Sequence, residues 1–196
     1  MAGPRFLEKV GMGQSEKKRV PTRNECLQLM DRYGMLENIV HHSLTVMKVA
    51  LFLSEELNKK GQQIDLGVIE AASLLHDLAK TECLKTKEDH AQAGSRLLRD
   101  LGFERVAEVV AQHIEVSGER ERTSLSEEEV VNYADKRVQH DRIVLLKERF
   151  KDLKNRYGTK PSTVEKLGQL ERVSLEIERK IFSILGTDPK DLSEMD

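Results

Sequence analysis

The sequence is poor in aromatic residues and in cysteine. Among its 196 residues there is no tryptophan, aromatic residues make up only 4%, and there are two cysteines. Leu, Val, Ile and Ala must therefore fill the core. Cys26 and Cys83 have no CxxC spacing, which favours two reduced thiols over a disulfide, a zinc finger or a redox motif.

Long apolar runs are missing as well. The longest runs are far too short for a membrane span, and residues 1–20 lack the continuous apolar stretch of a secretory signal. We therefore expect a cytoplasmic protein with no membrane partner. The formal net charge is -2 and the pI is near 6.3, so the chain has no overall basic field and we expect no nucleic-acid partner.

Helix signals, in contrast, are frequent, and strand signals are nearly absent. Thr22 and Ser126 are plausible N-caps, the segment from Ser126 has the capping-box pattern, and Gly186 is a plausible stop after a helix that begins at Pro161. Apolar spacing and caps together predict helices at 22–33, 36–60, 65–80, 89–101, 103–113, 126–135 and 161–185. We expect the helix from 126 to continue or bend towards a charged segment ending at 157–158, and an all-α fold.

The length and the pattern divide the chain into three parts. Residues 1–20 are expected to be a flexible leader, 21–150 a helical domain, and 151–196 a C-terminal helical extension. The extension has an amphipathic stripe, so we expect it to pack on the domain or to form a contact in a homodimer; a substrate lid is the third alternative.

Metal-competent side chains recur on the apolar stripes of these helices. His42 shares a face with Ile39 and Val46, and the stretch AASLLHDLAK places adjacent His and Asp residues in an otherwise apolar helix. A buried carboxylate costs several kcal/mol unless a hydrogen bond, an opposite charge or a metal compensates it. Across the chain, five predicted helices carry candidate metal ligands: His42, His76, Asp77, His90, His113 and Asp135.

Imidazole and carboxylate together suit Mn, Fe, Co, Ni or Zn better than Mg or Ca. The plainer interpretation of each residue remains open. A single histidine on an apolar face is usually a hydrogen-bonded core residue, and Asp135 alone would more often pair with an arginine such as Arg137 or Arg142. His41 and His140 are interpreted as solvent-facing or supporting groups.

The order His42, His76–Asp77 and Asp135, with the contexts HSLTVMKVA, AASLLHDLAK and VNYADK, resembles the HD-domain superfamily of metal-dependent phosphohydrolases. The resemblance covers roughly residues 36–145 and implies an HD-domain helical bundle. It implies that those four residues bind a first divalent metal ion. In members with two further histidines, here at His90 and His113, it implies a second ion, with the HD aspartate bridging both.

The motif alone does not identify the subfamily, but the residues around it exclude two of them. The segment LAKT follows His76–Asp77, so the acidic pair of guanosine tetraphosphate hydrolases is missing, and AQHIEVSGER lacks the features of HD-GYP phosphodiesterases. The six-ligand arrangement most resembles small bacterial HD proteins, which include symmetrical dinucleoside-tetraphosphate hydrolases. Nothing in the sequence assigns the same substrate.

The implied activity is hydrolysis of a phosphate ester or anhydride, which we expect to belong to a nucleotide, by a metal-activated hydroxide. Besides Asp77, Lys80 is a candidate catalytic residue that would bind phosphate from the same helix face. The alternative interpretation of Lys80 is a solvated helix end. Arg120 and Arg122 lie in a polar segment that is either part of the entrance or a solvated loop. The alternative functions are a non-catalytic regulatory or ligand-binding HD module that retains metal, and a purely structural bundle.

Overall fold

The computed structural model describes residues 19–117 and 123–194. Most of the predicted leader and the residues Arg120 and Arg122 therefore lie outside the described residues. The elements are α1 (Arg23–Arg32), α2 (Glu37–Lys59), α3 (Leu66–Leu75), α4 (Lys80–Thr86), α5 (His90–Asp100), α6 (Glu104–Ala111), α7 (Glu127–Arg137), β1 (Val138–Gln139), β2 (Arg142–Ile143), α8 (Leu146–Tyr157), α9 (Pro161–Leu185) and the 3₁₀ turn η1 (Pro189–Glu194). The all-α prediction is confirmed.

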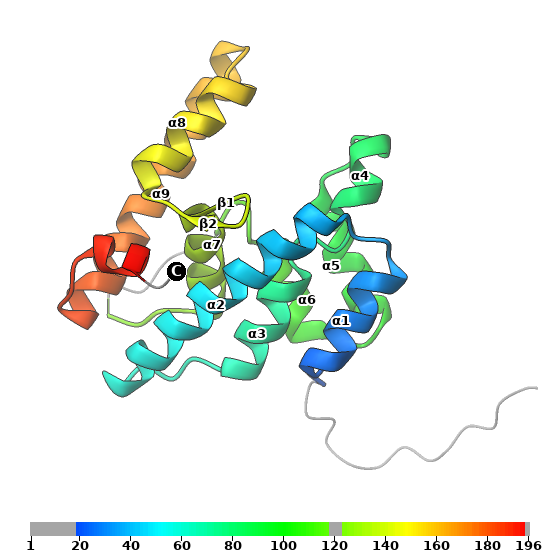
Figure 1. The fold of residues 1–196 in the computed structure, drawn as a ribbon, viewed down its shortest axis with the longest axis horizontal. Coiled ribbons are helices and arrows are strands. Elements are labelled where there is room, and N and C mark those ends of the chain that lie inside the picture. The colour runs from blue at the N-terminus through cyan, green and yellow to red at the C-terminus, as the bar shows by residue number, and fades with distance from the viewer. Residues whose placement is uncertain (1–18, 118–122, 195–196) are drawn as a thin grey trace, which may run out of the picture.

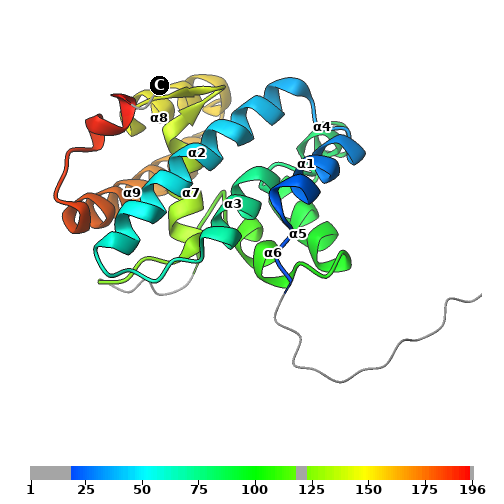
Figure 2. The same cartoon turned by 60° about the horizontal axis from the view of Figure 1, so that its bottom comes forward.

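Helix α2 runs through the middle of the molecule (Figure 1). In this view α1, α3, α4, α5 and α6 lie on one side of it, and α7, α8 and α9 lie on the other. In the turned view of Figure 2, α7 crosses α2 next to α3. Helix α3 packs along α2, and α7 crosses both. Helix α9 contacts α2 and α7, and α8 pairs with α9 in a helical hairpin that extends beyond the rest.

The ends of several helices follow the predicted signals. Thr22 and Ser126 each form a capping box, in which the side chain accepts a bond from the third helical residue and the glutamate there accepts one from the cap. Helix α9 begins at Pro161 and ends at Gly186, whose φ of 76° is the left-handed conformation that glycine adopts without strain.

The core is aliphatic and lies between α2, α3, α6 and α7. Its fully buried members include Leu53, Leu57, Ile69, Leu74 and Val131. None of the helices in the described part of the chain is long and apolar enough to cross a membrane.

Two of the predicted elements are wrong in their extent. The helix expected to reach about Lys80 ends at Leu75, and a separate short helix, α4, starts at Lys80. The helix from 126 ends at Arg137 and neither continues nor bends into the charged segment. A two-residue antiparallel hairpin intervenes, in which Val138 pairs with Ile143.

Candidate metal centre

His76 and Asp77 lie in a tight turn between α3 and α4, not within a helix as predicted. The amide of Leu78 bonds to the carbonyl of Leu75 at 3.0 Å, and that of Lys80 bonds to Asp77 at 2.9 Å. These i→i+3 bonds tighten the chain relative to an α-helix. Both side chains nevertheless reach one interior site, where His76 Nε2 lies 3.5 Å from Asp77 Oδ2.

Three histidines present one ring nitrogen each to this site in a fixed orientation. His42 Nδ1 lies 2.8 Å from the carbonyl oxygen of His140, His76 Nδ1 2.8 Å from that of Ser73, and His113 Nδ1 2.8 Å from that of Val110. A carbonyl oxygen can only accept, so Nδ1 is the donor in each case. The three Nε2 atoms are left to face the site, as in metal-bound histidines held by backbone carbonyls.

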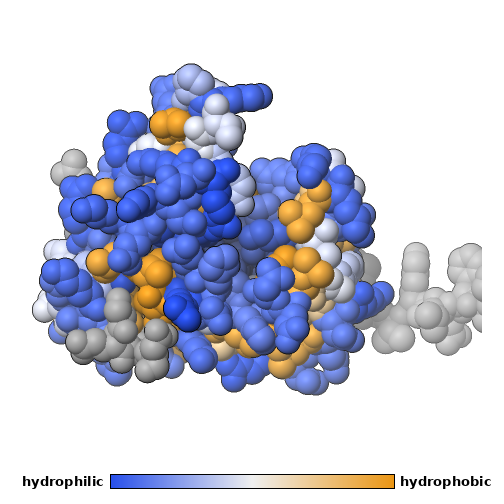
Figure 3. All heavy atoms as spheres, turned by 45° about the horizontal axis from the view of Figure 1, so that its top comes forward, coloured by the Kyte–Doolittle hydropathy of each residue, from blue (hydrophilic) through white to orange (hydrophobic). Residues whose placement is uncertain are grey.

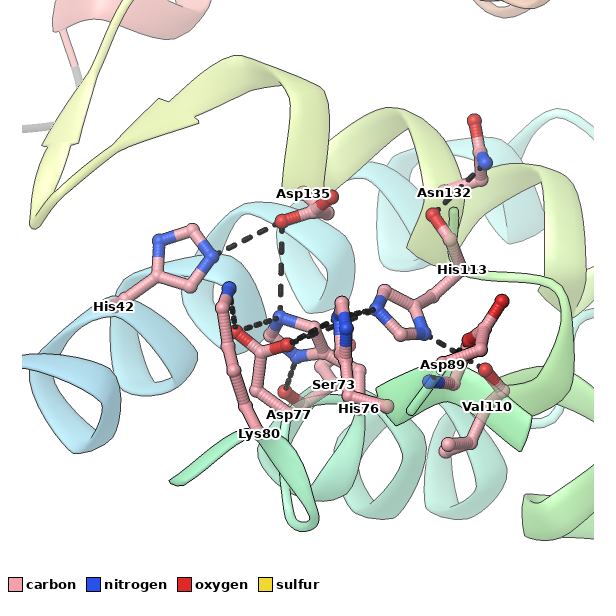
Figure 4. Close-up of polar contacts among 12 residues, drawn as sticks. His42, Ser73, His76, Asp77, Lys80, Asp89, Val110, His113, Asn132 and Asp135 are labelled. Atoms are coloured by element: carbon pink, nitrogen blue, oxygen red, sulfur yellow. Dashed lines mark hydrogen bonds and ion pairs between the residues drawn. The ribbon is translucent and has the colours of Figure 1, made fainter. Parts of the chain in front are cut away.

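Asp77 stands at the centre of the candidate ligands (Figure 4). Its Oδ1 lies 3.1 Å from His90 Nε2 and 3.7 Å from His113 Nε2, while its Oδ2 lies 3.5 Å from His76 Nε2. Two groups of potential ligand atoms therefore share this aspartate, and within each group the atoms lie within 4.8 Å of one another: His42, His76 and Asp77, and Asp77, His90 and His113.

Asp135 reaches the first group from α7. Its Oδ1 lies 3.0 Å from His42 Nε2 and 3.7 Å from His76 Nε2, and its Oδ2 accepts a bond from Lys136 at 2.6 Å. The arginine pairing considered as an alternative is wrong for Arg137, whose guanidinium instead faces Tyr133 and Glu178 on the other side of α7. The structure thus brings all six predicted ligands into one region.

The six candidate ligands lie on fewer helices than the five predicted from the apolar spacing. His42 and Asp135 lie within α2 and α7, and His90 is the first residue of α5. His113 follows the end of α6, as His76 and Asp77 follow the end of α3. Half of the set is therefore positioned by turns at helix ends. His41 is exposed, as predicted, and His140 supports the site through its backbone.

Two atoms of this site lack the partner that burial demands. His76 and Asp77 are fully buried, and neither His76 Nε2 nor Asp77 Oδ1 has a hydrogen bond of acceptable geometry. An unsatisfied buried polar group costs about 1–3 kcal/mol, and a charged one costs more. A divalent cation would satisfy both atoms, so the residues present fit a metal ion held by imidazole nitrogens and carboxylate oxygens.

The electrostatics keep both carboxylates ionised. Burial alone would raise the pKa of Asp77, but His76, His90 and Lys80 hold it well below its usual value. Burial acts in the same direction on Asp135, where Lys136 and the two nearby histidines lower the pKa instead. Burial lowers the pKa of His113 to about 3, so its imidazole is neutral at physiological pH, the form that binds a metal.

Several supporting residues were not predicted. The buried Lys136 bonds through Nζ to the carbonyl of His113 at 3.1 Å, and Asn132 Nδ2 bonds to the same carbonyl at 2.9 Å. Together they hold the turn after α6 against α7. The spacing of Asn132 one turn before Lys136 could have indicated a shared face, but only the folded chain shows that this face meets His113. Arg149 of α8, which lines a cavity together with His42, Asp77 and Lys80, was not predicted either.

Comparisons with known proteins agree with this geometry. Residues 39–138, about half of the chain, match a family model described as HD domain. A tRNA (cytidine(56)-2'-O)-methyltransferase of Picrophilus torridus is 28% identical over 194 residues, covering 90% of this chain and 51% of that protein. The enzyme of the same name from Thermoplasma volcanium is 30% identical over 115 residues, covering 56% of this chain and 32% of that protein.

An uncharacterized protein of Methanocaldococcus jannaschii is 33% identical over 79 residues, covering 40% of this chain and 46% of that protein. The chain thus spans about half or less of the length of these curated relatives. No solved structure matches it.

Proposed function

The chain belongs to the HD-domain family, and from this premise we propose that it is a metal-dependent phosphohydrolase that cleaves a phosphate ester or anhydride of a nucleotide. One observation carries the proposal. Three imidazoles, each fixed by a backbone carbonyl, turn Nε2 towards the buried carboxylates of Asp77 and Asp135, and His76 Nε2 and Asp77 Oδ1 are left without a hydrogen bond of acceptable geometry. A histidine that only fills the core would not need to face two carboxylates together with two other imidazoles.

Within this proposal, His42, His76, Asp77 and Asp135 would hold one divalent ion, and Asp77, His90 and His113 would hold a second. Mn, Fe, Co, Ni and Zn suit this donor set. When bound, such ions supply a water of lowered pKa and positive charge for the phosphoryl oxygens. The protein contributes rigid ligand positions, because each Nδ1–H is held by the backbone.

Lys80 gives the site a cation beside the candidate ligands. Its Nζ lies 2.7 Å from Asp77 Oδ2 and its side chain remains partly exposed, so the ammonium lies between the buried centre and solvent. From there it can donate to a non-bridging phosphate oxygen and stabilise negative charge as the leaving oxygen departs.

The names of the relatives do not transfer to this chain. The match to the Picrophilus torridus protein covers nearly all of this chain but only about half of that protein. We therefore assign the phosphohydrolase chemistry to the shared segment and propose that methyl transfer belongs to the part of the relative outside it. The alternative for this chain is a regulatory or ligand-binding HD module that keeps its metal without turnover.

A metal-by-substrate screen tests the proposal. The protein loaded separately with Mn²⁺, Fe²⁺, Co²⁺, Ni²⁺ or Zn²⁺ is offered nucleoside mono-, di- and triphosphates and dinucleoside polyphosphates, and products are separated chromatographically. We expect stoichiometric metal and release of phosphate or a nucleotide with at least one metal. Bound metal without any cleavage would favour the regulatory module. A metal-free protein whose melting temperature does not respond to metal or chelator would indicate a structural bundle.

The substitution Lys80→Ala separates metal binding from catalysis. We expect kcat/KM to fall about 10- to 100-fold, because one charge-assisted hydrogen bond to the phosphoryl group is lost, while the metal content stays unchanged. Lys85→Ala, on the exposed face of the same short helix, is the control and should behave as the parent. Full activity of Lys80→Ala would remove the proposed role.

A further inference from the structure

A cavity of about 250 Å³ opens beside the candidate metal centre. His42, Asp77 and Lys80 line its inner part, and Arg149, Leu153 and Arg156 line it from the side of α8. The space-filling view in Figure 3 shows this face of the molecule hollowed between the α8–α9 hairpin and the α4 side, with hydrophilic side chains around the hollow. A substrate can therefore reach the centre from here.

Helix α8 lies outside the segment that matches the HD-domain model, so the match assigns it no role. Arg149, Leu153 and Arg156 are spaced by four and three residues, which places them on one face of α8. All three line the cavity. This face of α8 therefore forms the wall opposite Lys80.

Arg149 is held in place without a full set of partners. Only 13% of its side chain is exposed, and its buried Nε has no hydrogen-bond partner. Its Nη1 lies 3.5 Å from Asp152, which also pairs with Arg156. One carboxylate is thus shared by two guanidinium groups, which leaves a net positive charge on this wall. A guanidinium with free donors at the rim of an anion-hydrolysing site is suited to a further phosphate.

The outer rim of the same cavity is apolar. Leu36, Leu84 and Tyr157 are among the most exposed large hydrophobic side chains of the described residues, at 46%, 54% and 55%, and all three line this cavity. The guanidinium of Arg156 lies 5.7 Å from the centre of the Tyr157 ring, so the ring is positioned next to the outer cation. Exposed apolar side chains gathered at one pocket indicate a ligand with an apolar face.

We infer that α8 forms the leaving-group side of the substrate pocket, where Arg149 and Arg156 bind a second phosphate and Tyr157 stacks on a base. The substrate class is accordingly a nucleoside diphosphate or triphosphate. The exposure of the lining side chains supports this, because it rises from the buried metal ligands through Arg149 to Lys80 and Arg156, and is greatest at Tyr157. At about 250 Å³, below the usual size of pockets that enclose a whole ligand, the cavity takes the phosphates while the base rests on the rim. This inference rests on the proposed function.

Binding without turnover tests the pocket. Adenosine 5′-(α,β-methylene)diphosphate, adenosine and inorganic phosphate are titrated calorimetrically into the metal-loaded chain of 196 residues. We expect Arg149→Gln and Arg156→Gln each to weaken binding of the diphosphate analogue about tenfold or more, as the loss of a charge-assisted phosphate contact predicts, with binding of adenosine unchanged. Tyr157→Ala should weaken the analogue and adenosine about fivefold or more, but not inorganic phosphate.

Lys151→Gln, on the exposed opposite face of α8, is the matched control and should bind all three ligands as the parent does. Arg156 is more exposed than Arg149, so its variant tests the pocket even if Arg149→Gln folds poorly. Unchanged analogue binding in both arginine variants would overturn the inference. Hydrolysis of nucleotides with an unchanged KM in those variants would also overturn it and leave the proposed function standing. Selective loss of analogue binding without hydrolysis under any metal would support the pocket and remove the proposed function.

Discussion

Asp77→Asn is expected to remove metal from both ligand groups and to lower kcat/KM by about a thousandfold or more. The carboxylate faces His90 and His113 with one oxygen and His76 with the other, so its charge serves both groups. An amide of the same size keeps the packing but loses the charge that a cation requires. Loss of metal-based stabilisation of the transition state costs several kcal/mol, and each 1.4 kcal/mol is a factor of ten.

His90→Ala is the informative companion, because His90 belongs to only one of the two groups. We expect it to lose one metal ion while the group of His42, His76 and Asp77 keeps the other. Metal is counted by elemental analysis after gel filtration. The stepwise difference between the two variants distinguishes a bridging carboxylate from two independent sites.

Asp141→Asn is the matched control, since it makes the same chemical change at an exposed residue. Its metal content and activity should equal those of the parent. The chelated Asp77→Asn protein should melt close to the chelated parent, because a neutral amide is easier to bury than a carboxylate. Retention of two ions by Asp77→Asn would contradict the assignment of this residue to both groups.

Local chemistry explains why much of the fold could be predicted. The capping boxes at Thr22 and Ser126, and the proline and glycine at the two ends of α9, act within a few residues of themselves. Such signals are readable from sequence because their hydrogen bonds are local.

No local sequence signal indicated that helix α3 ends at Leu75. Residues 66–86 contain no proline and only Gly67 near the start, so helical periodicity continued through the turn. The hairpin after α7 was equally hidden: its turn uses His140 with φ of 60°, not the Asn-Gly or Asp-Gly pair that usually indicates such turns. Both departures from helix bring backbone or side chains to the candidate metal centre.

The candidate site was accessible from sequence for a different reason. Imidazoles and carboxylates on the apolar faces of helices need polar partners or a metal ion in the core, and the apolar spacing predicts which of these side chains are buried. The interaction partners of each side chain could not be predicted in this way. Asp135 and Arg137 are two residues apart on α7 and face opposite networks. Arg149 lines the cavity only because the folded chain places α8 across the cavity from Lys80.

Arg137 holds the C-terminal part of the chain against this site. Its guanidinium is fully buried, and it donates to the carbonyl of Val144 at 2.7 Å and to that of Pro189 at 2.9 Å. It also donates to the hydroxyl of Tyr133 at 2.5 Å, and that hydroxyl donates to Glu178 of α9 at 2.7 Å. One side chain thus connects α7, the segment after the hairpin, α9 and η1.

Arg137→Met is therefore expected to lower the free energy of unfolding by about 3–5 kcal/mol, because it leaves a largely buried carboxylate and two carbonyls without their cation. For a chain of this size that corresponds to a fall of roughly 6–20 °C in melting temperature. Thermal and urea unfolding of the metal-free protein measure the effect without a contribution from metal. Arg142→Met, at an exposed position four residues before Leu146, should change the stability little.

The double variant Arg137→Met/Glu178→Leu identifies the cause. If the unpaired carboxylate dominates the cost, removing it should recover part of the lost stability, so the two substitutions together cost less than the sum of each alone. Strict additivity would place the cost in the lost carbonyl contacts instead. A change below about 1 kcal/mol in Arg137→Met would show that α9 and η1 are held by their apolar contacts alone.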